Sequence, residues 1–180
     1  MVEEGVLLWE PTPEVIEKAN ITRFAAWLGR RGASYQELWR WSVDEPAAFW
    51  TAIWDYFEVI GRRGDGPVLS GTMPKVEWFR GATLNYTENA LRHPGDRLAV
   101  IARNEAGERR TYTYAELAAE VARVRAGLVR LGVGRGDRVV AYLPNIPEAL
   151  IAFLATASLG AIWSSCSPDF GTSSVTDRFT

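Results

Sequence analysis

The sequence contains few of the residues that bind metals, form disulfides or act as nucleophiles. Cys166 is the single cysteine and His93 the single histidine among 180 residues. One cysteine excludes an internal disulfide framework and fits a reducing compartment. His93 has no Cys, Asp or Glu at metal-ligand spacing, so we expect it to cap the C-terminal turn of a helix that ends before Pro94.

Strong charge and long apolar runs are also missing. The formal net charge is −2, which does not indicate a partner such as nucleic acid or another polyanion. The longest apolar stretch, near Ile146–Ala161, is too short and too interrupted to cross a bilayer. The first five residues are acidic and lack the basic start and apolar core of a secretory signal. We therefore expect a cytoplasmic protein that binds neither nucleic acid nor membrane.

Tryptophan is abundant, and five of the eight tryptophans fall between Trp27 and Trp54. Helices are predicted at 21–30, at 35–41 with Ser34 as N-cap, and from Asp44 as N-cap, with Pro46 in the first turn. The last helix carries an apolar stripe at three- and four-residue spacing: Phe49, Trp50, Ile53, Trp54, Phe57 and Ile60. These rings would form either an aromatic platform that stacks a base or a packing layer, and helical spacing favours packing.

The segment Gly61–Pro67 is rich in glycine and charge and is predicted to be a surface loop. Its glycines also allow a phosphate-binding loop. That alternative is weak, because no strand precedes the segment, no Lys-Ser/Thr pair follows its last glycine, and Pro67 has no backbone donor.

From Leu98 the pattern becomes α/β. Strands at 98–103 and 109–112 flank a turn, and Thr113 and Glu116 form a capping box that opens a helix ending at Gly132. A strand at 138–143, a helix at 148–159 with Asn145 as N-cap, and a strand at 161–165 then form a βαβ unit with parallel strands.

Ligands of parallel sheets bind beyond the carboxyl ends of the strands. Here those ends are Pro144–Pro147 and Cys166–Gly171, and the second is the better candidate.

Several motifs resemble the acetyl-CoA-synthetase-like branch of the adenylate-forming superfamily. They follow one another in the order that the superfamily uses: Trp78–Asn89, Thr111–Leu117, Gly132–Val139 and Asn145–Ala149. Within that branch, Ser158–Gly171 with Val175 and the run 177–179 is similar to acetoacetyl-CoA synthetases. The resemblance covers essentially the whole chain.

The resemblance implies an α/β fold: a Trp-rich helical segment at 1–92, then the first, incomplete βαβ part of a large AMP-binding domain at 93–180. It implies an ATP-dependent acid–thiol ligase of lipid metabolism that uses acetoacetate, ATP, CoA and Mg²⁺. The superfamily's phosphate loop and catalytic lysine have no counterpart here, so we expect an N-terminal fragment that is inactive alone and belongs to a monomer or weak homo-oligomer.

The resemblance also implies that CoA contacts fall on Ser167, Pro168 and Asp169. The branch often has an aromatic residue and two glycines there, and a carboxylate suits phosphates poorly. The alternative is a turn that caps the next helix through Asp169 or Thr172. We expect no catalytic residue and no metal ligand in the chain, and Cys166 to be a small buried or half-buried residue rather than a nucleophile.

Two other functions stay open on the sequence. One is a ligase of the same branch for acetate or propionate, because the acyl pocket belongs to later segments of such enzymes. The other is a non-enzymatic α/β binding module. The module is disfavoured because a parallel pair with an almost wholly apolar helix needs further strands and helices to cover it.

Overall fold

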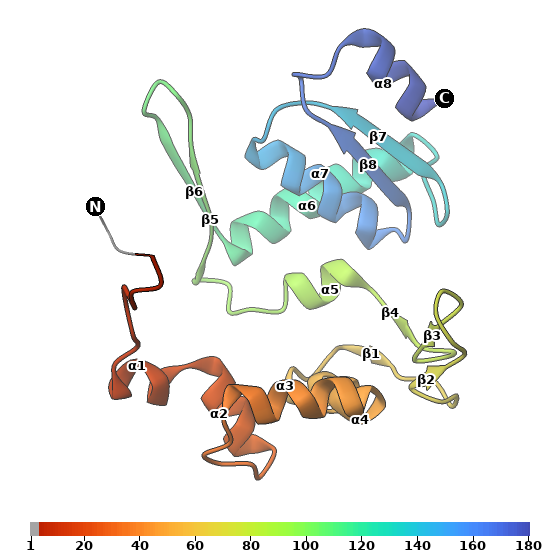
Figure 1. Cartoon of the computed structure of the whole chain (residues 1–180). Coiled ribbons are helices and arrows are strands. Elements are labelled where there is room, and N and C mark those ends of the chain that lie inside the picture. The colour runs from red at the N-terminus through yellow and green to blue at the C-terminus, as the bar shows by residue number, and fades with distance from the viewer. Residues whose placement is uncertain (1–3) are drawn as a thin grey trace. The chain divides into compact units, whose positions relative to one another are not determined.

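The computed structural model describes residues 4–180, which separate into two compact units, one ending at Ala82 and one from Thr83 to Thr180 (Figure 1). Residues 1–3, part of the acidic N-terminus, lie outside the described residues. The domain boundary predicted between 92 and 93 stays a prediction. The compact units divide ten residues earlier, because the short helix α5 (Tyr86–Ala90) contacts α7 (Pro147–Ser158).

The first unit is mainly helical, as its amphipathic spacing predicts. Its elements are α1 (Pro13–Lys18), α2 (Asn20–Trp27), α3 (Tyr35–Asp44), α4 (Pro46–Tyr56), β1 (Gly61–Arg62), β2 (Leu69–Ser70) and β3 (Glu77–Trp78). The capping box of α3 joins Ser34 and Glu37: the backbone N–H and hydroxyl of Ser34 donate to the carboxylate, and both bonds lower the pKa of Glu37.

The predicted N-cap at Asp44 is wrong. Asp44 is the last residue of α3, so it has helical backbone angles and does not cap the next helix. Glu45 occupies the N-cap position of α4 without a side-chain bond, and Pro46 takes the first helical position as predicted.

The aromatic side chains of the first unit pack against one another. Phe49 meets Trp41 and Trp50 edge-on, with ring centroids 5.6 and 5.3 Å apart, and Trp54 lies 5.0 Å from Phe79. Edge-to-face contacts of this kind stabilise a packed layer. The geometry therefore supports the packing interpretation of the stripe, but α4 ends at Tyr56, so Phe57 and Ile60 lie beyond the helix on which they were predicted.

Gly61 and Arg62 form the short strand β1, so only the rest of the predicted loop Gly61–Pro67 is irregular, and its glycines allow two backbone segments to approach closely. Gly64 has a φ of +83°, and a Cβ built on it would lie 2.6 Å from the carbonyl carbon of Gly81. A Cβ on Gly66 would lie 2.7 Å from the carbonyl oxygen of Arg80. Close packing of backbone against backbone explains these glycines without a phosphate ligand.

The second unit contains the predicted α/β pattern. Its elements are β4 (Thr83–Leu84), α5, β5 (Leu98–Arg103), β6 (Arg109–Thr113), α6 (Tyr114–Arg130), β7 (Arg138–Tyr142), α7, β8 (Ile162–Cys166) and α8 (Thr172–Phe179). β5 and β6 pair antiparallel, and β7 and β8 pair parallel with Arg138 opposite Ile162 and Tyr142 opposite Cys166. The predicted βαβ unit is confirmed.

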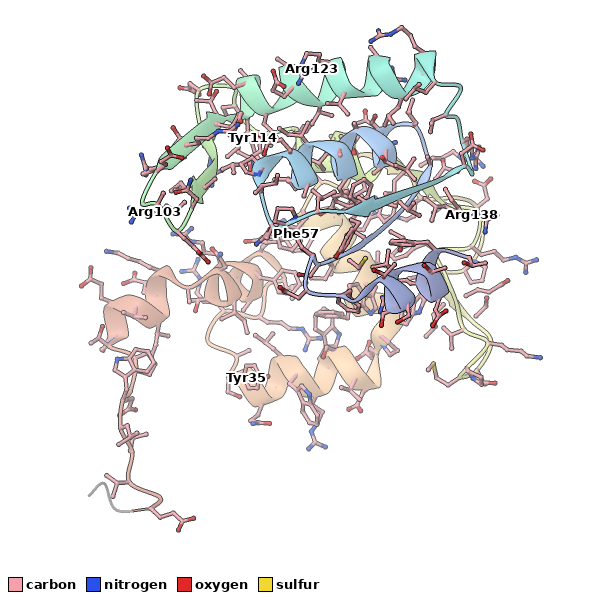
Figure 2. The ribbon with its side chains drawn as sticks, turned by 90° about the horizontal axis from the view of Figure 1, so that it is seen from above. Tyr35, Phe57, Arg103, Tyr114, Arg123 and Arg138 are labelled. Atoms are coloured by element: carbon pink, nitrogen blue, oxygen red, sulfur yellow. The ribbon has the colours of Figure 1, made fainter. Side chains whose placement is uncertain are left out.

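The layers of this unit follow from its apolar faces. α7 lies between α6 and the β7–β8 pair, and α8 lies on the other side of that pair (Figures 1 and 2). The core joins α6 and α7 through buried side chains: Leu117, Val121, Ile151, Leu154 and Ala155. Arg123 lies on the side of α6 turned away from α7, where it is exposed and pairs with Glu120. An amphipathic α6 and an almost wholly apolar α7 are what this order of layers requires.

The ends of α6 are those that the sequence predicts. The Thr113 hydroxyl accepts from the backbone N–H of Glu116. In return, the Glu116 carboxylate accepts from the Thr113 backbone N–H at 2.8 Å and from the Thr113 hydroxyl. These two bonds to the carboxylate lower the pKa of Glu116. Gly132 has a φ of +87° directly after the C-cap, and Val133 N–H bonds to the Leu128 carbonyl. This is a Schellman C-terminus.

Two other predicted caps are wrong. Ile146, not Asn145, is the N-cap of α7, because Pro147 holds the first helical position and forces its predecessor into an extended conformation. His93 does not cap α5, whose C-cap is Leu91. Instead, the ring of His93 lies 4.8 Å from that of Tyr114.

The short helix α5 is fixed onto α7 by polar bonds. The Asn85 side chain caps α5 and donates to the carbonyls of Ala157 and Ser158 at 3.1 and 3.3 Å. The buried hydroxyl of Thr87 donates to the Leu154 carbonyl at 2.7 Å. α5 therefore belongs to the second unit by its contacts.

Candidate functional site

The candidate site is the segment Ser167–Gly171, called here the β8–α8 loop. It follows β8 directly, and β7 ends beside it because Tyr142 is paired with Cys166 in the parallel register. Both strands therefore present their carboxyl ends at one edge, where ligands of α/β sheets bind. The structure brings the three predicted residues Ser167, Pro168 and Asp169 together in this one loop.

The β8–α8 loop is a hydrogen-bonded turn. The Ser167 hydroxyl donates to the Asp169 carboxylate at 2.7 Å and accepts from the Asp169 backbone N–H at 3.3 Å. The backbone N–H of Phe170 donates to the Ser167 carbonyl at 3.1 Å. Neither Asp169 nor Thr172 caps α8, whose N-cap is Gly171 without a side-chain bond. The predicted turn is present, but its capping role is wrong, because Asp169 bonds to Ser167 instead.

Side chains from outside the loop also hold it. The Tyr142 hydroxyl donates to the carbonyls of Pro168 and Phe170, at 2.7 and 3.0 Å. The guanidinium of Arg178, on α8, lies 4.9 Å from the centre of the Phe170 ring. Sequence reasoning missed Tyr142, although its position at the carboxyl end of a parallel strand was a usable signal.

The donor and acceptor groups of the loop decide which ligand chemistry fits. Pro168 has no backbone N–H, and the N–H groups of Asp169 and Phe170 already bond to Ser167. Within the loop few donors are left for a phosphate, and the Asp169 carboxylate would repel one, although the first N–H groups of α8 have no side-chain cap. Asp169 is exposed, and its carboxylate can accept further hydrogen bonds besides the one from Ser167, which suits a ligand that donates through amide N–H or hydroxyl groups.

Cys166 is buried at the end of β8, with 7% of its surface exposed. The prediction that it is a small buried residue is confirmed. A buried thiol has no access to a substrate, which agrees with a structural role.

The segment Pro144–Pro147, which follows β7 and leads into α7, has a different environment from the β8–α8 loop. Arg110 of β6 forms an ion pair with Glu148 of α7 at 2.9 Å, and this hydrogen bond is the main cause that raises the pKa of Arg110. The pKa of Glu148 is lowered, first by its own backbone N–H and then by Arg110. Both side chains are about half exposed, so the pair joins the hairpin to α7 weakly.

The first unit contains a separate apolar cavity of about 440 Å³. Its walls come from α2, α3 and α4 and include Phe24, Trp41, Phe49 and Tyr56. No Asp, Glu, Lys or Arg lines it, so it is unsuited to a phosphate or a carboxylate substrate.

Metal and membrane sites are not found in the described part of the chain. Among residues 4–180, no group of three or more His, Cys, Asp and Glu side chains is placed to hold a metal ion. Within the same residues, no helix combines the length and apolar character needed to cross a bilayer.

Comparison with known families gives two matches in succession along the chain. The model described as the N-terminus of acetyl-coenzyme A synthetase matches residues 35–90, and the model of the AMP-binding enzyme matches residues 86–179. The second match covers more than half of the chain and contains the β8–α8 loop. The chain belongs to the AMP-binding enzyme family.

The relatives to which this chain is similar include acetoacetyl-CoA synthetases. The chain is 45% identical to the acetoacetyl-CoA synthetase of Rhizobium meliloti (strain 1021), and the matched region covers 96% of this chain and 27% of the relative. It is 42% identical to the acetoacetyl-CoA synthetase of Macaca fascicularis, and the matched region covers 98% of this chain and 27% of the relative. The solved acetoacetyl-CoA synthetase from Streptomyces lividans is 47% identical with a TM-score of 0.87, over 95% of this chain and 28% of that one.

The chain thus spans about a quarter of the length of these relatives. The predicted family and α/β fold are confirmed. The assignment of Ser167, Pro168 and Asp169 to a ligand stays a prediction.

Proposed function

We propose that this chain is part of an AMP-forming acid–thiol ligase that converts acetoacetate, ATP and CoA into acetoacetyl-CoA, AMP and diphosphate. The observation that carries the proposal is similarity at 42–47% identity, over nearly the whole chain, to proteins named acetoacetyl-CoA synthetase. Such a ligase first forms an acyl-adenylate with release of diphosphate. The thiol then forms a thioester with release of AMP.

Within that reaction we assign the β8–α8 loop to CoA, and to its neutral pantetheine arm rather than its phosphates. The arm has amide N–H and hydroxyl donors, and the exposed carboxylate of Asp169 would accept from them. Ser167, Pro168 and Asp169 would bind and orient the arm. The described residues offer no cluster of metal ligands, so Mg²⁺ enters the proposal only as a requirement of the complete protein.

The test compares two polypeptides: the product of the complete reading frame that contains this sequence, and residues 1–180 alone. We expect diphosphate release that depends on acetoacetate from the first and none from the second. Assays with acetate and propionate separate the acyl specificities within the branch. Absence of release with all three acids, or activity in residues 1–180 alone, would contradict the proposal. Fractionation of the source cells tests the cytoplasmic location that we also propose.

A further inference from the structure

Tyr142, at the end of β7, is hydrogen-bonded to the β8–α8 loop, which follows the neighbouring strand β8. Its hydroxyl lies 2.7 Å from the Pro168 carbonyl and 3.0 Å from the Phe170 carbonyl. These two carbonyls flank Asp169 on either side. A single phenolic proton thus fixes the backbone on both sides of the carboxylate.

The other hydrogen bonds of the turn do not attach it to the sheet. The Ser167–Asp169 pair and the Phe170 N–H bond lie within the loop, so they shape the turn without locating it. Tyr142 comes from β7, where it stands opposite Cys166 at the last paired position of the parallel ladder. Its side chain therefore sets where the turn lies relative to the strand ends.

We propose that Tyr142 is a positioning residue, which holds the β8–α8 loop in the geometry that accepts the pantetheine arm of CoA. This inference rests on the proposed function. The Tyr142 hydroxyl is occupied by the two loop carbonyls, so it acts on the loop and not by a hydrogen bond to the ligand. It acts by limiting the motion of the loop before CoA arrives, and such preorganisation lowers the cost of binding.

The test is Tyr142→Phe in the complete protein, which keeps the ring and removes the hydroxyl. Loss of these hydrogen bonds should raise the KM and the Kd for CoA about three- to tenfold. The Kd is measured by calorimetry. Acetoacetate-dependent exchange between ATP and diphosphate does not involve CoA, and it should keep its rate. This split between the two half-reactions is not expected from a general loss of structure.

A second readout needs no ligand. The backbone N–H groups of Asp169 and Phe170 are bonded within the turn, so their hydrogen exchange reports opening of the loop. In Tyr142→Phe these amides should exchange about three to ten times faster, while amides of α7 stay unchanged. Tyr35→Phe is the matched control: Tyr35 is 65% exposed in the first unit, and no hydrogen bond of its hydroxyl is seen among the described residues.

The outcomes separate this inference from the proposed function. If the wild-type protein shows no acetoacetate-dependent exchange, the proposed function fails. If exchange occurs but Tyr142→Phe leaves both the KM for CoA and the loop amides unchanged, the positioning role is wrong. Equal losses in exchange and in thioester formation would also overturn it, because they indicate general damage.

Discussion

Replacing Leu154 by alanine should lower the free energy of unfolding of residues 83–180 by about 2–5 kcal/mol. Leu154 is 3% exposed and lies in the cluster that joins α6 to α7. Removing its methyl groups would leave a cavity whose walls are rigid helices, so little collapse can offset the loss. Native-state hydrogen exchange of amides in α6 and α7 measures the change within this unit.

Leu150→Ala is the matched control, since it removes the same atoms one turn earlier in α7. Leu150 is 38% exposed, so less of its surface is withdrawn from water and the expected cost is below about 1.5 kcal/mol. Equal effects of the two substitutions would contradict the position of the core. A small effect of Leu154→Ala would do so as well.

Gly64→Ala should destabilise the first unit by about 2–4 kcal/mol. Part of the cost arises from a φ of +83°, which alanine adopts poorly. The larger part arises from contact, because the new Cβ would lie 2.6 Å from the Gly81 carbonyl carbon and 2.8 Å from the Ala82 nitrogen. These are backbone atoms, so no side-chain rotation relieves the clash.

Tryptophan fluorescence during urea unfolding measures this effect, because Trp163 alone of the eight tryptophans lies outside the first unit. Gly32→Ala is the control that separates the two causes. Gly32 has a φ of +85° with no atom within 4 Å of the added Cβ, so only the backbone penalty of about 1–2 kcal/mol should appear. If the two variants are equally stable, the close approach of Gly64 to residues 80–82 is wrong.

Local signals in the sequence predicted most of the elements. β5 begins and ends where alternation and turn residues place it, and the capping box at Thr113 fixes the start of α6. Helix caps were predicted less well where a proline or a preceding helix decides the position, as at Ile146 and Glu45. Backbone restriction by the neighbouring residue outweighs side-chain preference at such sites.

The candidate site was predicted only in part. The β8–α8 loop follows from the βαβ pattern, and Ser167, Pro168 and Asp169 follow from the family resemblance. The bond from Tyr142 could not be predicted, because it joins positions 26 and 28 residues apart through the tertiary packing of two strands. The bond between Arg110 and Glu148, 38 residues apart, was missed for the same reason.

The attachment of α5 to α7 also has a consequence for synthesis on the ribosome. Thr87 and the Leu154 carbonyl that accepts its proton are separated by 67 residues. At about 5–20 residues per second, roughly 3–13 seconds pass between the translation of the two positions. During that interval the hairpin β5–β6 and the helix α6 can form from local contacts. Over the same interval α5 lacks its polar bonds to α7, and a chaperone that binds nascent chains has time to hold it.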